Sequence, residues 1–312
     1  MRFAGKKLRV GGRYTPFSMR KPEMTGTGGF SEINKRSDDR RKERNHMRVV
    51  IQENYDKMCK WAANHIAARI HAHNNSGNTR PFVLGLPTGS SPIGVYRELV
   101  RMNQAGELSF ANVVTFNMDE YLGLPREHDQ SYWYFMHDNL FNHLVDMKPE
   151  NINILNGMTD DPEKECRDYE EKIAAMGGID LFMGGIGVDG HIAFNEPFTS
   201  LSSRTGVRNL TTDTRIVNSR FFGNDPEKVP SQALSVGVGT VFDSREVMIL
   251  INGHNKARAL AATVEGGVSQ KWTCSALQQH NAAIIACDEA ACGELTVDTY
   301  RYFLDIEKGE RL

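Results

Sequence analysis

Short apolar runs alternate with helical patterns from Arg48 to Ile306, and this alternation restricts the possible folds more than any other feature. The apolar runs of strand length are 48–51, 82–86, 113–116, 179–183, 247–251 and 283–287. Apolar residues at helical spacing predict helices over 56–72, 92–103, 131–144, 161–175, 255–264 and 297–306. Strands that are apolar on both faces indicate a parallel sheet covered on both sides. We therefore expect an α/β fold: a doubly wound, mostly parallel sheet with helices on both faces, in a single domain.

The basic N-terminal segment is expected to lie outside this domain. Residues 1–46 carry 13 Lys/Arg against 5 Asp/Glu, a charge of +8, whereas the remainder carries 24 against 34, a charge of −10. Few apolar residues and several glycines predict a disordered extension, with residues 47–312 as the catalytic domain. A targeting peptide and a misassigned start upstream of Met47 remain alternatives. The segment lacks the interleaved aromatic residues of a nucleic-acid-binding tail, so we expect no nucleic-acid partner.

Neither a membrane nor a disulfide framework is expected. No apolar run approaches the roughly 18 residues that a membrane-spanning helix needs. None of the five cysteines forms a CxxC pair, and Cys59 and Cys287 lie in apolar patterns. This usage indicates structural thiols in a reducing compartment. We therefore predict a cytoplasmic protein.

The run from Gly184 to Pro197 carries the ingredients of an acid/base site. It follows the predicted strand 179–183, and its glycines permit a tight turn. Asp189, His191 and Glu196 then lie within eight residues. A histidine flanked by carboxylates is suited to proton transfer near neutral pH. The alternative is a structural histidine that bonds a backbone carbonyl.

A second candidate is a phosphate-binding loop between the strand 82–86 and the following helix. The small residues Thr88, Gly89, Ser90 and Ser91 let backbone N–H groups and hydroxyls converge beside a helix N-terminus, which suits a phosphate. The lysine and the spacing of a Walker loop are absent. A simple turn with a helix cap would give the same pattern.

Charged residues follow other predicted strands. Asp119 comes after the strand 113–116, placed to remove a proton from carbon next to a carbonyl, unless it is only a turn residue. Lys256 begins the helix after 247–251, where a cation is unfavourable unless an anion lies nearby. Arg220 is a second possible anion ligand. An exposed lysine on a helix face is the commoner explanation of any single lysine.

These loops are expected to meet, because ligands of parallel sheets bind beyond the C-terminal strand ends. The polar segment 199–218 follows the acid/base loop directly, and its length predicts a mobile lid, or alternatively a polar surface excursion. No histidine spacing indicates a metal site, so none is predicted. The acidic residue that a nicotinamide-binding strand pair requires is also missing.

With these residues in view, the chain resembles the glucosamine-6-phosphate deaminases from about Met47 to Phe303. The motifs that carry the resemblance are Gly85–Gly89, Phe116–Tyr121, Met183–Pro197, Asn218–Phe222 and Val236–Thr240. The resemblance implies a doubly wound fold and a C–N hydrolase of amino-sugar catabolism. That enzyme converts glucosamine 6-phosphate and water to fructose 6-phosphate and ammonia, without metal or organic cofactor. It also implies a homo-oligomer, commonly a hexamer.

The resemblance further implies a role for each candidate residue. Asp119 would move a proton from C2 to C1 of the sugar through an enolamine-like intermediate. His191 would assist opening of the sugar ring, with Asp189 and Glu196 as its carboxylate partners. Thr88 to Ser91 would bind the substrate phosphate, together with Arg220 and Lys256.

Some positions depart from the family pattern. Ser90-Ser91 stands where many members have Gly-Thr. Gly206 and Arg208 replace basic residues with which some bacterial members bind an activator, N-acetylglucosamine 6-phosphate, so this activation is not expected. Two alternatives are a 6-phosphogluconolactonase and a non-catalytic sugar-phosphate sensor. Phe194-Asn195-Glu196-Pro197 disfavours the lactonase, and the absence of a helix-turn-helix pattern in residues 1–46 disfavours the sensor.

Overall fold

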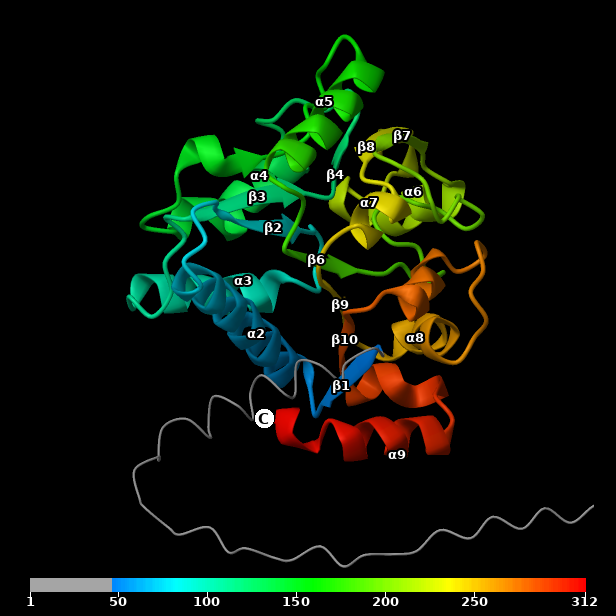
Figure 1. Cartoon of the computed structure of the whole chain (residues 1–312). Coiled ribbons are helices and arrows are strands. Elements are labelled where there is room, and N and C mark those ends of the chain that lie inside the picture. Colours follow the sequence, from blue (N-terminus) through cyan, green and yellow to red (C-terminus); the bar gives the residue numbers. More distant parts are fainter. Residues whose placement is uncertain (1–46) are drawn as a thin grey trace, which may run out of the picture. The chain divides into compact units, whose positions relative to one another are not determined.

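The computed structural model describes residues 47–312, which contain a large parallel sheet (Figure 1). Its strand order is β1-β10-β9-β6-β2-β3-β5, and every neighbouring pair is parallel. The strands are β1 (Arg48–Gln52), β2 (Phe82–Leu86), β3 (Val113–Asn117), β5 (Ile152–Asn153), β6 (Leu181–Gly185), β9 (Val247–Ile251) and β10 (Ala283–Asp288). The six predicted strands are all present. The extension predicted for residues 1–46 lies outside the described residues.

Helices follow most of these strands. They are α2 (Tyr55–Asn75), α3 (Ile93–Gln104), α4 (Tyr132–Asn139), α5 (Pro162–Ala175), α6 (Thr212–Asn218), α7 (Val238–Phe242), α8 (Ala257–Val264) and α9 (Val297–Ile306). Capping side chains explain several starts: Asn54, Ser131 and Asp161 each accept a hydrogen bond from the backbone N–H three residues on. The helix predicted over 131–144 is shorter, because α4 ends at Asn139 and a 3₁₀-helix, Phe141–His143, follows Leu140.

The helices cover both faces of the large sheet. Val50 of β1 packs in a core cluster with residues of α2, α3 and α4. Its neighbours Val49 and Ile51 point to the opposite face and pack with residues of α5, α7, α8 and α9. Strands that are buried on both faces need apolar residues at successive positions, which explains the continuous apolar runs. The predicted doubly wound fold is confirmed.

A second, antiparallel sheet was not predicted. It has the order β4-β8-β7 and consists of β4 (Asp119–Tyr121), β8 (Gln232–Ser235) and β7 (Gly206–Asn209). It lies near α6 and α7 in Figure 1. The segment 199–218, predicted as a lid or surface excursion, contains β7 and α6 and therefore has regular structure. Its mobility stays a prediction.

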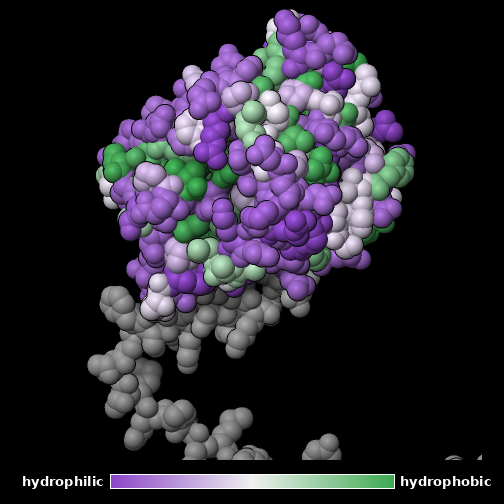
Figure 2. Space-filling model, turned by 90° about the horizontal axis from the view of Figure 1, so that it is seen from above, coloured by the Kyte–Doolittle hydropathy of each residue, from purple (hydrophilic) through white to green (hydrophobic). Residues whose placement is uncertain are grey.

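Two further expectations concern the surface and the thiols. Among residues 47–312, no helix is both long and apolar enough to cross a membrane. The face in Figure 2 is mostly hydrophilic, with hydrophobic residues scattered in small groups. All five cysteines are buried and free, as expected for structural thiols.

Candidate active site

The candidate residues lie in loops that leave one edge of the large sheet. From the central pair β2 and β6, the chain runs outward through β3 and β5 on one side and through β9 and β10 on the other. Beyond the carboxyl ends of such a central pair, the loops diverge and leave a crevice that ligands occupy. The phosphate-binding loop follows β2, and the acid/base loop follows β6. The topology thus brings the two predicted loops to the same edge of the sheet, where such a crevice is expected.

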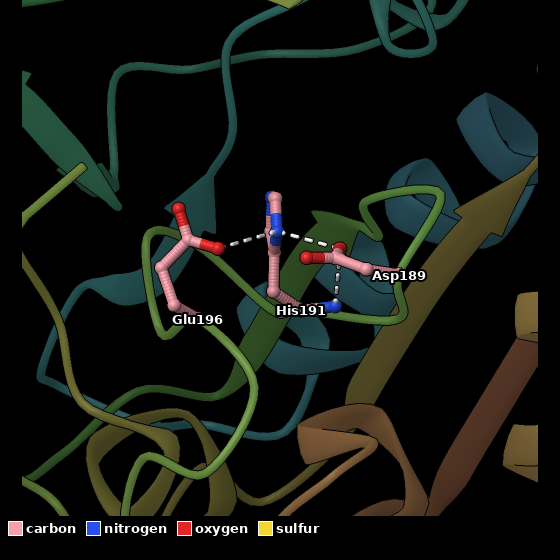
Figure 3. Close-up of side chains that lie close together, drawn as sticks. All are labelled: Asp189, His191 and Glu196. Atoms are coloured by element: carbon pink, nitrogen blue, oxygen red, sulfur yellow. Dashed lines mark hydrogen bonds and ion pairs between the residues drawn. The ribbon is translucent and has the colours of Figure 1, made fainter. Parts of the chain in front are cut away.

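His191 lies between two carboxylates in the acid/base loop (Figure 3). Its Nδ1 is 2.8 Å from Oδ1 of Asp189 and 3.9 Å from Oε2 of Glu196. Gly187 permits this arrangement, because a Cβ at that position would overlap both the Asp189 carboxylate and the imidazole. The imidazole is largely shielded from solvent, so its interaction with the two carboxylates is weakly screened. The structure brings these three side chains together, and their role in proton transfer stays a prediction.

The two carboxylates have different environments. Burial acts to raise the pKa of Asp189, but the hydrogen bond and charge interaction with His191 outweigh it and hold the pKa below its usual value. Glu196 accepts hydrogen bonds at Oε1 from the hydroxyls of Thr214 (2.6 Å) and Thr211 (3.3 Å). Its Oε2 is buried and has no hydrogen-bond partner among residues 47–312; Nδ1 of His191 lies 3.9 Å away. This oxygen is therefore free to receive a proton or a ligand.

Asp119 opens β4 and is 6% exposed. Burial, with a smaller contribution from the adjacent Glu120, raises the pKa of Asp119 to about 8. Glu120 points elsewhere: it accepts hydrogen bonds from the N–H groups of Tyr132 (3.0 Å) and Trp133 (2.9 Å) and so caps α4. A buried carboxyl with a pKa near neutrality is suited to general base catalysis.

The small sheet connects Asp119 to the acid/base loop. The antiparallel register pairs Asp119 with Ser235 of β8. The hydroxyl of Ser235 accepts a hydrogen bond from the N–H of Phe194 (3.0 Å), two residues before Glu196. The side-chain amide of Asn195 also donates to the carbonyl of Val236 (2.8 Å). Asp119 and His191 therefore lie at the same edge of the fold, as predicted.

The phosphate-binding loop is joined to the strand that precedes Asp119, because the N–H of Met118 donates to the carbonyl of Leu86 (3.0 Å). Gly89 turns the loop with a φ of +94°. The Tyr55 hydroxyl donates to the carbonyl of Ser90 (3.1 Å) and accepts from the N–H of Gly94 (3.0 Å).

The end of this loop leads into α3, and no side chain caps the N-terminus of this helix. The hydroxyl of Ser91 donates to Oδ1 of Asn252 (2.6 Å), in the loop after β9. Neither a side-chain cap nor an acidic residue occupies the first turn of α3. This end of the helix therefore keeps partial positive charge for an anion.

Lys256 and Arg220 contribute positive charge beside the acid/base loop. Lys256 follows β9 at the end of a short 3₁₀-helix, His254–Lys256, and its Nζ donates to the carbonyl of Ile186 (2.6 Å). Burial lowers the pKa of Lys256 to about 8; Asp189 raises it, and Arg220 lowers it further. Arg220 is exposed and lies over the ring of Phe221, 4.6 Å from its centroid. Lys256 is thus anchored at the acid/base loop, and phosphate binding by both residues stays a prediction.

The His191 group also has the composition of a cation site. Potential ligand atoms of Asp189, His191 and Glu196 all lie within 4.8 Å of one another. A proton relay requires the same placement, with one imidazole nitrogen facing two carboxylates. The prediction that no metal is used stays a prediction. Sequence reasoning missed Thr211 and Thr214, whose only signal was the polarity of the segment 199–218.

Comparison with known proteins supports the resemblance found in the sequence. The family model described as glucosamine-6-phosphate isomerases/6-phosphogluconolactonase matches residues 53–286. The chain belongs to this family. The glucosamine-6-phosphate deaminase of Parabacteroides distasonis is 61% identical over 262 residues, which are 84% of this chain and 96% of that protein. The one from Phocaeicola vulgatus is 62% identical, over 84% of this chain and 99% of that protein.

Solved structures of the family agree on the fold. A monomeric glucosamine-6-phosphate deaminase superposes with a TM-score of 0.75 at 39% identity, covering 79% of this chain and 99% of that one. The 6-phosphogluconolactonase from Trypanosoma cruzi gives a TM-score of 0.61 at 17% identity, covering 81% and 98% of the two chains. At that identity the lactonase shows only a shared fold. The high identity lies with the deaminases.

Proposed function

We propose that this protein is a glucosamine-6-phosphate deaminase, which converts glucosamine 6-phosphate and water to fructose 6-phosphate and ammonia. One observation carries the proposal: a buried carboxyl, Asp119, lies at the same edge as a carboxylate-flanked histidine, His191, and an open helix N-terminus. Curated deaminases about 61% identical over 84% of the chain support the same activity.

Substrate binding is proposed to begin at the phosphate. The loop Thr88 to Ser91 would receive it with backbone N–H groups, hydroxyls and the N-terminus of α3. Arg220 and Lys256 would add positive charge. A phosphate held at one end of a hexose fixes the position of the other end, which lowers the entropic cost of reaching the reactive geometry.

Ring opening is assigned to His191. The imidazole would carry a proton between the hydroxyl at C1 and the ring oxygen, so that the cyclic sugar becomes an open-chain aldehyde. Asp189 orients the ring through the 2.8 Å contact with Nδ1. Glu196, whose Oε2 has no hydrogen-bond partner within residues 47–312, would be the second acceptor for this proton.

Isomerisation is assigned to Asp119. Its carboxylate would remove the proton from C2 of the open-chain sugar and return it to C1, by way of an enolamine. The resulting imine at C2 adds water and then releases ammonia, which leaves the ketone of fructose 6-phosphate. The Asp119 pKa of about 8 makes the carboxylate a stronger base than an ordinary aspartate. The positive charge of the substrate ammonium would help to keep it ionised.

The decisive experiment measures ammonia release from glucosamine 6-phosphate by the purified protein. We expect turnover of this substrate and none of 6-phosphogluconolactone, assayed in parallel. Lactone hydrolysis without ammonia release would instead favour the lactonase alternative. Binding of the amino sugar phosphate without turnover would favour the sensor.

The compartment, the metabolic role and the oligomeric state are proposed from resemblance to the same family. We propose a cytoplasmic hydrolase of amino-sugar catabolism that forms homo-oligomers, although the solved deaminase at 39% identity is described as monomeric. Light scattering coupled to size-exclusion chromatography would give the mass in solution. A single species near the chain mass of 35.0 kDa would refute the oligomer.

A further inference from the structure

Three consecutive residues, Trp272, Thr273 and Cys274, hold the acid/base loop from outside the candidate active site. The N–H of Cys274 donates to the carbonyl of Gly190 (3.0 Å). The ring of Trp272 packs so closely on Gly190 that a Cβ there would overlap it. None of the three belongs to the residues assigned above to proton transfer or phosphate binding.

Thr273 makes the most specific of these contacts. Its Oγ1 accepts a hydrogen bond from the N–H of Ile192 (3.2 Å) and donates to the carbonyl of Asn195 (3.1 Å). Thr273 and Asn195 are 0% exposed and Ile192 is 1% exposed. Ile192 and Asn195 also form an antiparallel backbone bridge with each other. Buried backbone groups need protein partners, and removing the hydroxyl would take one partner from each of the two.

The turn that Thr273 bridges lies directly between His191 and Glu196. Within it, Ala193 has a φ of +51°, a left-handed conformation that is unfavourable for a residue other than glycine. Such a conformation persists only where surrounding contacts enforce it. Thr273 joins the first and last residues of this turn, Ile192 and Asn195, with one hydroxyl group.

We propose that Thr273 is a positioning residue for the reaction: its hydroxyl fixes the turn that sets the His191 imidazole relative to the Glu196 carboxylate. The inference rests on the proposed deaminase activity for its kinetic consequence. Its structural consequence, a rigid turn, does not depend on the substrate. Thr273 acts only through the loop and contacts no reacting group.

The test compares three variants by steady-state kinetics with glucosamine 6-phosphate. Thr273→Val keeps the shape and removes the hydroxyl; we expect kcat to fall roughly 10- to 100-fold, since small misplacements of reacting groups have effects of this size. KM should change less than about 2-fold, because the phosphate-binding loop is untouched. Thr273→Ser restores the hydroxyl and should recover most of kcat.

Thr263→Val is the matched control. Thr263 is also 0% exposed; its hydroxyl lies 2.7 Å from the carbonyl of Ala259 in its own helix and 2.8 Å from Sγ of Cys274, but it bonds no residue of the turn 192–195. We expect a comparable loss of thermal stability with kcat unchanged. A kcat for Thr273→Val within about 2-fold of wild type, or an equal loss of kcat in both valine variants, would overturn the proposal. If Thr273→Val is insoluble, Thr273→Cys, with its weak hydrogen-bonding thiol, decides by the same criterion.

Hydrogen–deuterium exchange separates this inference from the proposed activity. The peptide spanning residues 186–198 should exchange several-fold faster in Thr273→Val than in Thr263→Val, whether or not the protein turns over glucosamine 6-phosphate. Equal exchange in the two variants refutes the positioning role. An inactive wild-type protein with faster exchange in Thr273→Val refutes only the deaminase assignment.

Discussion

Replacing Asp119 by asparagine should make the protein more stable and nearly inactive. In the folded protein burial raises the pKa of this carboxyl from 3.8 to about 8. In the unfolded chain the carboxyl ionises near its ordinary pKa of 3.8. Between these values the folded state binds more protons than the unfolded state, so the contribution of Asp119 to stability falls as the pH rises. Below about pH 4 the carboxyl is protonated in both states, so it does not lower the free energy of unfolding. By about pH 8 its destabilising effect has reached its full size.

The size of the effect follows from the shift. Each pKa unit corresponds to 1.36 kcal/mol, so at pH 7 the ionisation of Asp119 in the unfolded chain lowers the free energy of unfolding by at most about 4 kcal/mol. The asparagine side chain does not ionise, so the free energy of unfolding of the variant is not lowered in this way. Its advantage over wild type should therefore grow by about 1 kcal/mol per pH unit between pH 5 and 7.5.

Urea unfolding of the two proteins at pH 5, 6 and 7.5 measures this difference directly. In parallel, ammonia release should fall by about 10²–10⁴-fold in the variant, the usual contribution of a general base. In wild type, kcat/KM should rise with pH as Asp119 ionises, up to about pH 8. A stability difference that does not depend on pH, or near-normal turnover of Asp119→Asn, would refute the reasoning.

Three further predictions concern other parts of the molecule. Lys256→Ala should mainly weaken substrate binding and raise KM, because a half-buried cation is lost; an unchanged KM would contradict a role in phosphate binding. Deletion of residues 1–46 should leave kcat and KM intact, and loss of folded protein would show that this segment belongs to the domain. Exhaustive treatment with EDTA should leave turnover unchanged, whereas loss restored by a divalent cation would assign Asp189, His191 and Glu196 to a metal.

The large sheet could be predicted because its strands are buried on both faces. Uninterrupted apolar runs predicted the observed bounds of β2 and β9, and helical spacing predicted those of α9. The small sheet lacked such a signal. β4 has three residues and begins one residue after β3, while β7 is only partly buried, so neither shows an apolar run or a clear alternation. Pairing with β8 across more than 100 residues positions β4.

The site was predictable where a single loop contains the chemistry. Asp189, His191 and Glu196 are neighbours in sequence, and the structure groups them. Contacts between distant residues could not be foreseen. Thr273 approaches the loop from about 80 residues away, and a buried threonine carries no signal in the sequence. The carbonyl of Ile186 as a partner of Lys256 was equally hidden.

The central pair of the large sheet, β2 and β6, is joined along a short stretch. β2 and β6 share only two paired positions, Leu84 with Leu181 and Gly85 with Phe182, whereas β2 and β3 share five. Residues before Tyr121 supply one side of the proposed sugar site, and residues after Gly185 supply the other. A hexose phosphate held there would bridge one of the short strand pairings of the sheet. Substrate would then stabilise the architecture as well as react within it.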